Sequence, residues 1–296
     1  MRGRVLAVYL SICVLWGSTW SLNALALRDV PPLLFVGVRS ALAAALLAPV
    51  ALRQMSGIPW RWMAGIAVLQ VAIPYGLMFI AQQWTPSALC AVLFASFPVW
   101  MVLFARVMLP GEQLTPRRIL GAILGISGVA VLQGSAFSRI DASSRIALGG
   151  VLIVTASILA AAANVLVRRS PHVVRPLALT FGQTAVSAAL LLTASVAFEH
   201  GRVAVWSPLA MGAVVYLAVF GTIATYAGLY WLAPRVSVSA IGAIPLVDTT
   251  VAVALGALVL REPVGWNLVA GGALVLSAVA LEAAAPPRPA SSSALA

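Results

Sequence analysis

The stretch Glu112-Gln-Leu-Thr-Pro-Arg-Arg-Ile-Leu-Gly-Ala-Ile-Leu-Gly-Ile-Ser-Gly-Val-Ala-Val131 has a degenerate copy 150 residues further along the chain. The copy is Glu262-Pro-Val-Gly-Trp-Asn-Leu-Val-Ala-Gly-Gly-Ala-Leu-Val-Leu-Ser-Ala-Val-Ala-Leu281. Identical residues include the pairs Glu112/Glu262, Gly121/Gly271, Leu124/Leu274, Ser127/Ser277 and Val129/Val279. A duplicated block of apolar helices is typical of transporters, whose substrate site lies near the membrane midplane between the two repeats.

The composition indicates a membrane protein. Hydrophobic residues make up 62% of the chain and charged residues 8%, whereas a soluble domain has about 25% charged residues. The mean hydropathy is +1.05. A membrane span needs about 20 predominantly apolar residues. We expect an all-α membrane protein with ten transmembrane helices, near residues 5–27, 32–52, 60–82, 87–109, 117–134, 146–169, 175–198, 207–232, 236–260 and 264–282.

The predicted helices divide into two repeats of five, at residues 1–140 and 141–283. Because five is an odd number, the second repeat enters the membrane from the opposite side, so the repeats are inverted. Residues 37–47 also resemble residues 181–191, which aligns Arg39 with Gln183. The tail at 284–296 is rich in Pro and Ser and is predicted to be disordered and cytoplasmic.

The net charge of +11 comes from 18 basic residues, all of them Arg. They are spread over many loops and form no stripe, which argues against nucleic acid as a partner. With the N-terminus in the cytoplasm and ten spans, 12 Arg lie on the cytoplasmic side, 5 on the far side, and Arg39 within a span. The positive-inside rule therefore places both termini in the cytoplasm.

Several segments resemble the EamA-type members of the drug/metabolite transporter superfamily. They are Leu15-Trp-Gly-Ser-Thr19, residues 31–47, residues 87–98, and Gly111-Glu112 with the Gly-rich span that follows. The resemblance covers residues 1–283. It implies ten helices in inverted repeats, cytoplasmic termini, and export of small metabolites from the cell through the inner membrane. It also implies a cavity lined by the first, third, fourth, sixth, eighth and ninth spans.

The sequence departs from the family pattern at two places in its second half. The family's proline that matches Pro98 aligns with Thr249, and Gly111-Glu112 becomes Arg261-Glu262. The repeated Glu112 and Glu262 each precede a final helix, where an acid is favoured by the helix dipole. We therefore expect a structural role for both.

Two ionisable residues inside spans are candidate site residues. An Arg at the centre of a span needs a partner or a wet cavity. Arg39 therefore holds a carboxylate of the substrate or the protein, or else snorkels to lipid phosphate or caps a broken helix. Asp248 carries a coupling proton, pairs statically with Arg39, or is a structural residue hydrogen-bonded by Thr249 and Thr250.

Prolines and aromatic residues complete the candidate site. Pro74, Pro98 and Pro245 interrupt apolar segments and free backbone carbonyls, either as hinges or as static kinks. Polar and aromatic side chains within spans suit a half-apolar cavity, or form ordinary packing and interfacial anchors, a role expected for Trp20, Trp60 and Trp206. The candidates for substrate contact are Trp16, Tyr75, Phe79, Trp100, Asn164, Tyr226 and Tyr230.

These features predict a secondary transporter that exports a small metabolite, an amino acid or an amphipathic drug-like compound, by alternating access. A flippase for lipids or lipid-linked sugars is the alternative. The expected partners are the solute, the lipid bilayer and, if coupling exists, protons. The Gly-rich spans offer a packing face or a homodimer face. No phosphate-binding loop, catalytic pair or metal-binding spacing is present, so we expect no enzyme, cofactor or metal.

Overall fold

The computed structural model describes residues 3–85, 87–109, 115–132, 144–259 and 266–283, which form helices and contain no strand. Residues 112, 262 and the tail at 284–296 lie outside this range, so the predictions for them stay as they are. The helices are α1 (Gly3–Ala26), α2 (Pro32–Ala51), η1 (Leu52–Gln54), α3 (Trp60–Ala67), η2 (Val68–Ala72), α4 (Ile73–Ala81), α5 (Ser87–Phe94), α6 (Phe97–Met108), α7 (Pro116–Leu132), α9 (Ser144–Arg169), η3 (Pro171–Val173), α10 (Pro176–Phe198), α11 (Pro208–Ala218), η4 (Val219–Ala224), α12 (Thr225–Leu232), α13 (Val238–Gly242), α14 (Ile244–Val259) and α15 (Trp266–Ala283).

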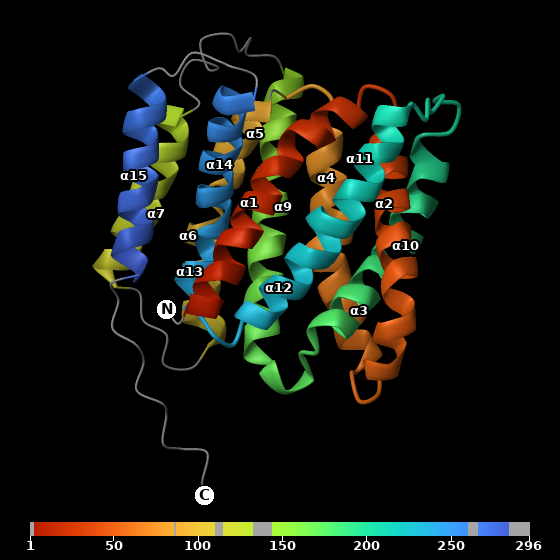
Figure 1. The fold of residues 1–296 in the computed structure, drawn as a ribbon, viewed down its shortest axis with the longest axis horizontal. Coiled ribbons are helices and arrows are strands. Elements are labelled where there is room, and N and C mark those ends of the chain that lie inside the picture. Colours follow the sequence, from red (N-terminus) through yellow and green to blue (C-terminus); the bar gives the residue numbers. More distant parts are fainter. Residues whose placement is uncertain (1–2, 86, 110–114, 133–143, 260–265, 284–296) are drawn as a thin grey trace, which may run out of the picture.

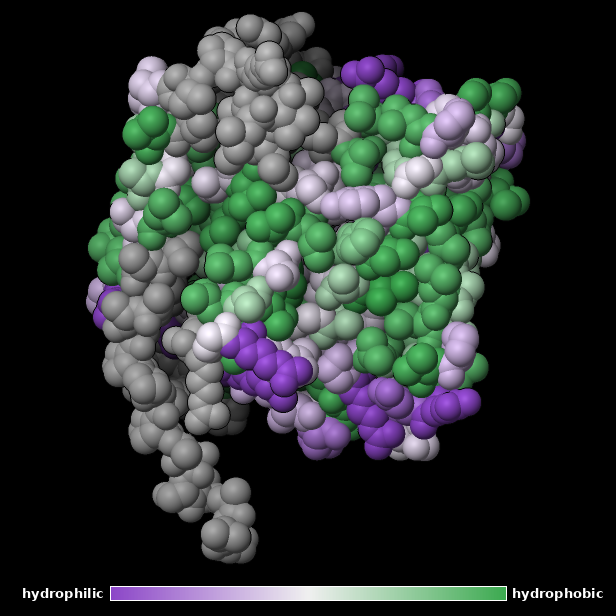
Figure 2. All heavy atoms as spheres, in the orientation of Figure 1, coloured by the Kyte–Doolittle hydropathy of each residue, from purple (hydrophilic) through white to green (hydrophobic). Residues whose placement is uncertain are grey.

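The outside of this bundle is suited to lipid. Six helical segments in the described part of the chain are long and apolar enough to cross a membrane. Large apolar side chains point outward from them, among them Val151 at 62%, Val196 at 76% and Val215 at 54% exposed. Figure 2 shows this surface as a broad hydrophobic band with hydrophilic residues toward the two ends. The all-helical membrane fold predicted from composition is therefore confirmed.

Two pairs of helices flank the bundle (Figure 1). At one edge α7 packs along α15, and at the other α2 packs along α10. The α7–α15 contact is close because both helices present glycine. A Cβ atom added at Gly271 would lie 2.6 Å from the backbone nitrogen of Leu132 and 2.7 Å from the carbonyl oxygen of Gly128. The predicted glycine face is thus buried within the chain, where it joins two distant segments.

Four of the predicted spans are interrupted. The segment 60–81 changes from α-helix to π-helix at η2, and the segment 208–232 does the same at η4. Two further segments break into short helices, α5 with α6 around Ala95 and α13 with α14 around Ala243. Two interruptions fall in each half of the chain. π-helical turns inside α-helices occur frequently at functional sites, which directs attention to the space between these four segments.

The prolines explain part of this pattern. Pro74, Pro98 and Pro245 each occupy the second residue of the helix after an interruption. A proline is tolerated there because the first backbone N–H groups of a helix have no partner in the helix. Pro98 in α6 and Pro245 in α14 thus hold the same position in their helices, whereas Thr249, which the sequence aligned with Pro98, lies further into α14.

Candidate functional site

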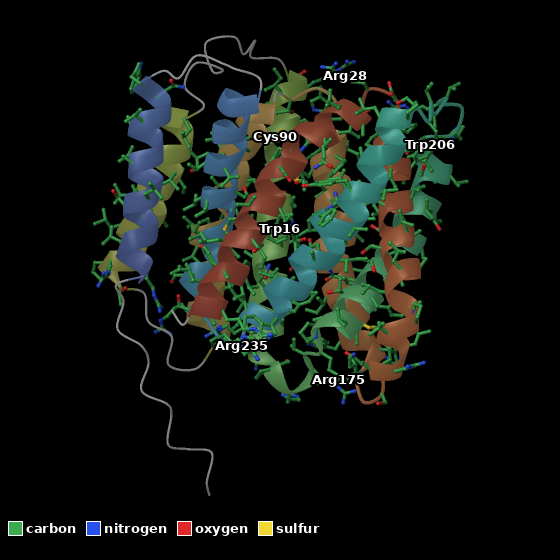
Figure 3. The ribbon with its side chains drawn as sticks, in the orientation of Figure 1. Trp16, Arg28, Cys90, Arg175, Trp206 and Arg235 are labelled. Carbon is green, nitrogen blue, oxygen red and sulfur yellow. The ribbon has the colours of Figure 1, made fainter. Side chains whose placement is uncertain are left out.

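A cavity lies where the four interrupted segments meet α1, α2 and α9. It contains about 90 Å³ of space open to the centres of water molecules, enough for about six to nine waters. Figure 3 places Trp16, one of its lining residues, near mid-height of the bundle. Arg28 and Trp206 mark one end of the molecule and Arg175 and Arg235 the other. The helices that contribute are those the family resemblance implied, with α2 in addition.

Seven of the nine candidate contact residues line this cavity, and they come from both halves of the chain. They are Trp16, Arg39, Tyr75, Phe79, Asn164, Tyr226 and Asp248. Of the candidate hinges, Pro74 and Pro245 also line it, whereas Pro98 lies beside a smaller cavity against α7. The candidates chosen from the sequence therefore lie around one cavity although Trp16 and Asp248 are more than two hundred positions apart in the chain.

Arg39 extends from α2 into the cavity wall and is 2% exposed. Its Nε donates a hydrogen bond to Oγ1 of Thr222 at 2.9 Å, and its Nη2 donates to the carbonyl oxygen of Gly221 at 2.8 Å. Its guanidinium carbon lies 5.4 Å from the ring centre of Tyr75. Within the described residues no carboxylate takes part in these contacts, so neutral groups alone hold the guanidinium.

The π-helical turn η4 supplies both hydrogen-bond acceptors of Arg39, Gly221 and Thr222. A π-turn shifts the hydrogen-bond pattern and leaves carbonyl groups without their usual helical partners. The carbonyl oxygen of Gly221 accepts from Arg39 and also from Nε1 of Trp16 at 3.3 Å. Thr222 in turn donates to the carbonyl of Leu217 at 2.9 Å. Gly221 lacks a side chain that would crowd Arg39, since a Cβ there would lie 3.1 Å from Nη2.

Asp248 lies one turn into α14 and is 6% exposed. Its carboxyl group is a hydrogen-bonding partner of the Trp20 side chain, and Oγ1 of Thr249 lies 3.4 Å from its Oδ1. Thr250 instead donates to the backbone carbonyl of Leu246 at 3.0 Å. At this level α1 crosses α14 closely, and Gly17 allows the approach. A Cβ added at Gly17 would lie 2.7 Å from the backbone oxygen of Asp248.

An aromatic cluster forms the side of the cavity next to Arg39. The rings of Trp16 and Tyr226 meet edge to face at 5.6 Å, and Tyr75 lies 6.0 Å from Phe79 and 6.4 Å from Tyr226. The hydroxyl of Tyr226 donates to that of Tyr75 at 3.1 Å. Aromatic walls with a few fixed polar groups are typical of small-molecule sites.

Amide side chains add polar atoms to the cavity. Asn164 of α9 donates to Oε1 of Gln70 at 3.1 Å and to the carbonyl of Ala160 at 2.8 Å. Asn23 is 4% exposed, and its Oδ1 has no hydrogen-bond partner within the described part of the chain. An unpaired buried acceptor that borders a cavity is satisfied by a solute or water.

The interruptions also bring prolines and the residues before them to the cavity. A proline removes a helical hydrogen bond to the carbonyl four residues before it, which for Pro74, Pro98 and Pro245 is that of Gln70, Phe94 and Ile241. All three of those residues line the cavity. The carbonyl of Phe94 accepts from Oγ of Ser157 at 3.4 Å, and that of Ile241 accepts from the backbone N–H of Ala243. Irregular backbone at membrane depth needs such partners within the protein.

Two candidate contact residues do not line the cavity. Trp100 donates to Oγ of Ser96 at 3.1 Å and packs in the bundle. Tyr230 is fully buried and donates to Oε1 of Gln183, the residue that the repeat aligned with Arg39. Tyr230 was chosen because its helical spacing puts it on the face of Tyr226, and Trp100 because it is an aromatic residue within a span, but neither side chain lines the cavity.

Other lining residues were missed. Trp20 was expected to be an interfacial anchor, which is wrong, because it lines the cavity and bonds Asp248. By contrast, Trp60 and Trp206 are exposed, at 67% and 38%, as interfacial anchors would be. Thr222 holds Arg39 without lining the cavity itself, and it carried no sequence signal, since a threonine in a span is usually bonded to its own helix. It lies in the π-helical turn η4, which no periodic pattern in the sequence indicated.

Comparison with known proteins identifies the fold and the family. The model of the EamA-like transporter family matches residues 3–133 and again residues 147–282. The chain is 25% identical over 275 residues to the uncharacterized transporter YvbV of Bacillus subtilis, covering 91% of this chain and 88% of YvbV. It is 29% identical over 259 residues to the uncharacterized inner membrane transporter YedA of Escherichia coli, covering 86% and 81%.

A solved crystal structure, described only as that of a protein, shares the fold at a TM-score of 0.80 and 22% identity, covering 95% of this chain and 96% of that one. The family model matches nearly all of the chain, once in each half. This multi-pass membrane protein therefore belongs to the EamA-like transporter family.

Proposed function

We propose that this protein is a secondary transporter that exports a small metabolite across the cytoplasmic membrane by alternating access. The observation that supports it most is the mid-height cavity, which is buried, polar in part, and bordered by interruptions in four helical segments. Transporters bind their solutes near the membrane midplane, at discontinuous helices of two repeats. The solute is an amino acid or an amphipathic drug-like compound, and the outward direction comes from the family resemblance.

The topology that we propose has ten spans in two inverted repeats, with both termini in the cytoplasm. The family model matches each half separately, and the interruptions occur pairwise in the two halves. The segment α1 begins at the end of the molecule at which α15 ends (Figure 1). That end carries Arg175 and Arg235 (Figure 3), which agrees with the excess of arginine on the cytoplasmic side.

In the proposed mechanism the two halves rock about the cavity and expose it to one side at a time. The interruptions at η2, η4, Ala95 and Ala243 are the places where bending requires the fewest hydrogen bonds to break, because those bonds are already rearranged. Pro74, Pro98 and Pro245 serve as hinges in this scheme. Arg39, Asp248, Asn164 and the aromatic cluster contact the solute.

Asp248 is the proposed carrier of a coupling proton. Among the described residues it is the buried carboxyl group that borders the cavity, and its partners Trp20 and Thr249 are neutral. A carboxyl group in that setting exchanges a proton without breaking an ion pair. Proton entry would then drive solute exit, because the same cavity accepts one or the other.

Reconstitution in liposomes tests the proposal. Uptake of labelled amino acids and cationic drugs is measured with the lumen more acidic than the medium, and again without a gradient. We expect flux that rises with the gradient and loses this dependence in Asp248→Asn. Asp29→Asn is the matched control, since Asp29 bonds Ser207 at the far end of the molecule, outside the cavity.

Each outcome decides a different part of the proposal. Gradient-dependent flux that persists in Asp248→Asn would refute the role of Asp248. Flux without any gradient dependence would identify a facilitator. A lack of flux for every solute would refute metabolite transport and favour lipid as the cargo.

A further inference from the structure

The chemistry of the cavity distinguishes between the two solute classes of the proposed function. Arg39 and Asp248 are the charged side chains among the described residues that line it. Asp248 has hydrogen-bond donors from Trp20 and Thr249. Arg39 has the acceptors of Thr222 and Gly221, a hydrogen bond with the Tyr75 side chain and the ring of Tyr75 beside it, and all of these groups are neutral. Its charge therefore lacks a counter-ion in the described part of the chain.

A buried cation is stabilised far more by an anion than by neutral acceptors, because opposite charges interact strongly where water is excluded. A guanidinium group offers five N–H donors in a planar fork that matches a carboxylate. The bonds to Thr222 and Gly221 occupy Nε and one hydrogen of Nη2 and fix the plane of the group. Donors remain on the guanidinium for a ligand that enters the cavity.

The surroundings of Arg39 indicate the rest of the ligand. Tyr75 lies under the guanidinium, and Trp16 and Tyr226 adjoin Tyr75 in one aromatic wall. Trp16 shares with Arg39 the carbonyl oxygen of Gly221 as acceptor, so the wall and the cation are held in one arrangement. A solute with an anionic end and a flat apolar body would satisfy both parts of this surface.

We propose that Arg39 binds the carboxylate of an organic solute whose aromatic or other flat apolar part lies against Trp16, Tyr75 and Tyr226. This inference rests on the proposed function and narrows its substrate class to carboxylates. It removes purely cationic drugs from that class, since Arg39 repels a cation that has no anionic group. The carboxylate is the group required for binding, and an amine is not.

Binding to the purified full-length protein tests the inference. Calorimetric titration compares three solutes that differ only in their terminal group: 3-phenylpropionate, 3-phenylpropanol and 3-phenylpropylamine. We expect the carboxylate to bind at least about tenfold more tightly than the alcohol, since a hydrogen bond to a charged group contributes about that much. The amine should bind no more tightly than the alcohol.

Variants at Arg39 assign the preference to its charge. Arg39→Gln should remove the carboxylate preference, and Arg39→Lys should retain part of it, because lysine keeps the charge and loses the planar fork. Arg235→Gln is the matched control, an exposed arginine outside the cavity. If Arg39→Gln does not fold, the three solutes on the unaltered protein and on Arg39→Lys still decide the question.

The result that overturns the inference is a carboxylate preference that survives in Arg39→Gln, or binding of the amine as tight as that of the carboxylate. Flux of the same solutes into liposomes separates this failure from that of the proposed function. Flux of the alcohol or amine without a carboxylate preference would leave transport standing and refute the carboxylate site. Arg39-dependent binding of 3-phenylpropionate without flux of any solute would leave the carboxylate site standing and refute transport.

Discussion

Glu199 joins the two halves of the chain, and replacing it with alanine should destabilise the fold strongly. The residue follows α10 and is 7% exposed. Its Oε1 accepts the backbone N–H of Leu33 at 2.9 Å, and its Oε2 accepts that of Leu34 at 2.9 Å and Oγ of Ser195 at 2.8 Å. Leu33 and Leu34 lie in the first turn of α2, where N–H groups have no partner within the helix.

The structure sets the size of the effect. Glu199→Ala removes the acceptor of one buried and one partly buried backbone donor. An unsatisfied buried donor costs about 1–3 kcal/mol, and loss of a helix cap costs about 0.5–2 kcal/mol. The buried donor and the cap together predict a loss of roughly 1.5–5 kcal/mol in the free energy of unfolding. Glu199→Gln keeps one acceptor and should fall between the two proteins.

Unfolding by sodium dodecyl sulfate in mixed micelles measures this difference. Arg202→Ala is the control, since Arg202 is exposed and its hydrogen bond to Gln83 also crosses between distant segments. Exposed substitutions usually change stability by about 0.5 kcal/mol or less. A Glu199→Ala protein as stable as Arg202→Ala would contradict the assignment of Glu199 as the cap of α2.

Two further substitutions test packing and buried polarity with the same unfolding assay. Gly271→Ala should lower the free energy of unfolding by about 1–3 kcal/mol, because the added Cβ would meet the backbone of α7. Gly212→Ala is the control, since a Cβ there has open space and should stabilise α11 slightly. Equal effects of the two substitutions would refute the close α7–α15 contact. Tyr230→Phe should lower the free energy of unfolding by about 1–3 kcal/mol, because it removes the hydroxyl that donates to Oε1 of Gln183. The Nε2 of Gln183 already has no partner in the described residues. An unchanged stability would refute the Tyr230–Gln183 hydrogen bond.

Much of the fold could be predicted from the sequence, because lipid imposes a simple rule. Every backbone polar group in hydrocarbon must be bonded within the segment, so long apolar runs are helices. The expected segment 5–27 is α1 at 3–26, and the segment 146–169 is α9 at 144–169. The helix boundaries agree to within about two residues because the connections are short.

The interruptions were only partly predictable. Pro74, Pro98 and Pro245 indicate them because proline removes a backbone donor. The π-helical turn η4 has no proline, and its Gly221 carbonyl accepts from Arg39, a contact between α2 and η4. A contact between residues so far apart in the chain leaves no periodic pattern in either segment.

The candidate site, like the fold, could be predicted from the sequence only in part. Arg39 and Asp248 were recognisable because a charged residue in a span is costly and therefore rare. Trp20 was misassigned because its place near the end of a span is also that of an interfacial anchor. Trp100 was chosen by its type, but side-chain type says little about direction, which helix packing decides.

Counterflow in liposomes tests the central claim of alternating access most directly. Liposomes that contain the protein are loaded with unlabelled phenylalanine, which has a carboxylate and a flat apolar body, and are then diluted into a trace of labelled phenylalanine. An alternating-access carrier predicts that loading accelerates entry of the label and produces a transient accumulation above the external level. Entry of the label that loading does not accelerate would contradict the account, because a cavity open to both sides at once gives that result.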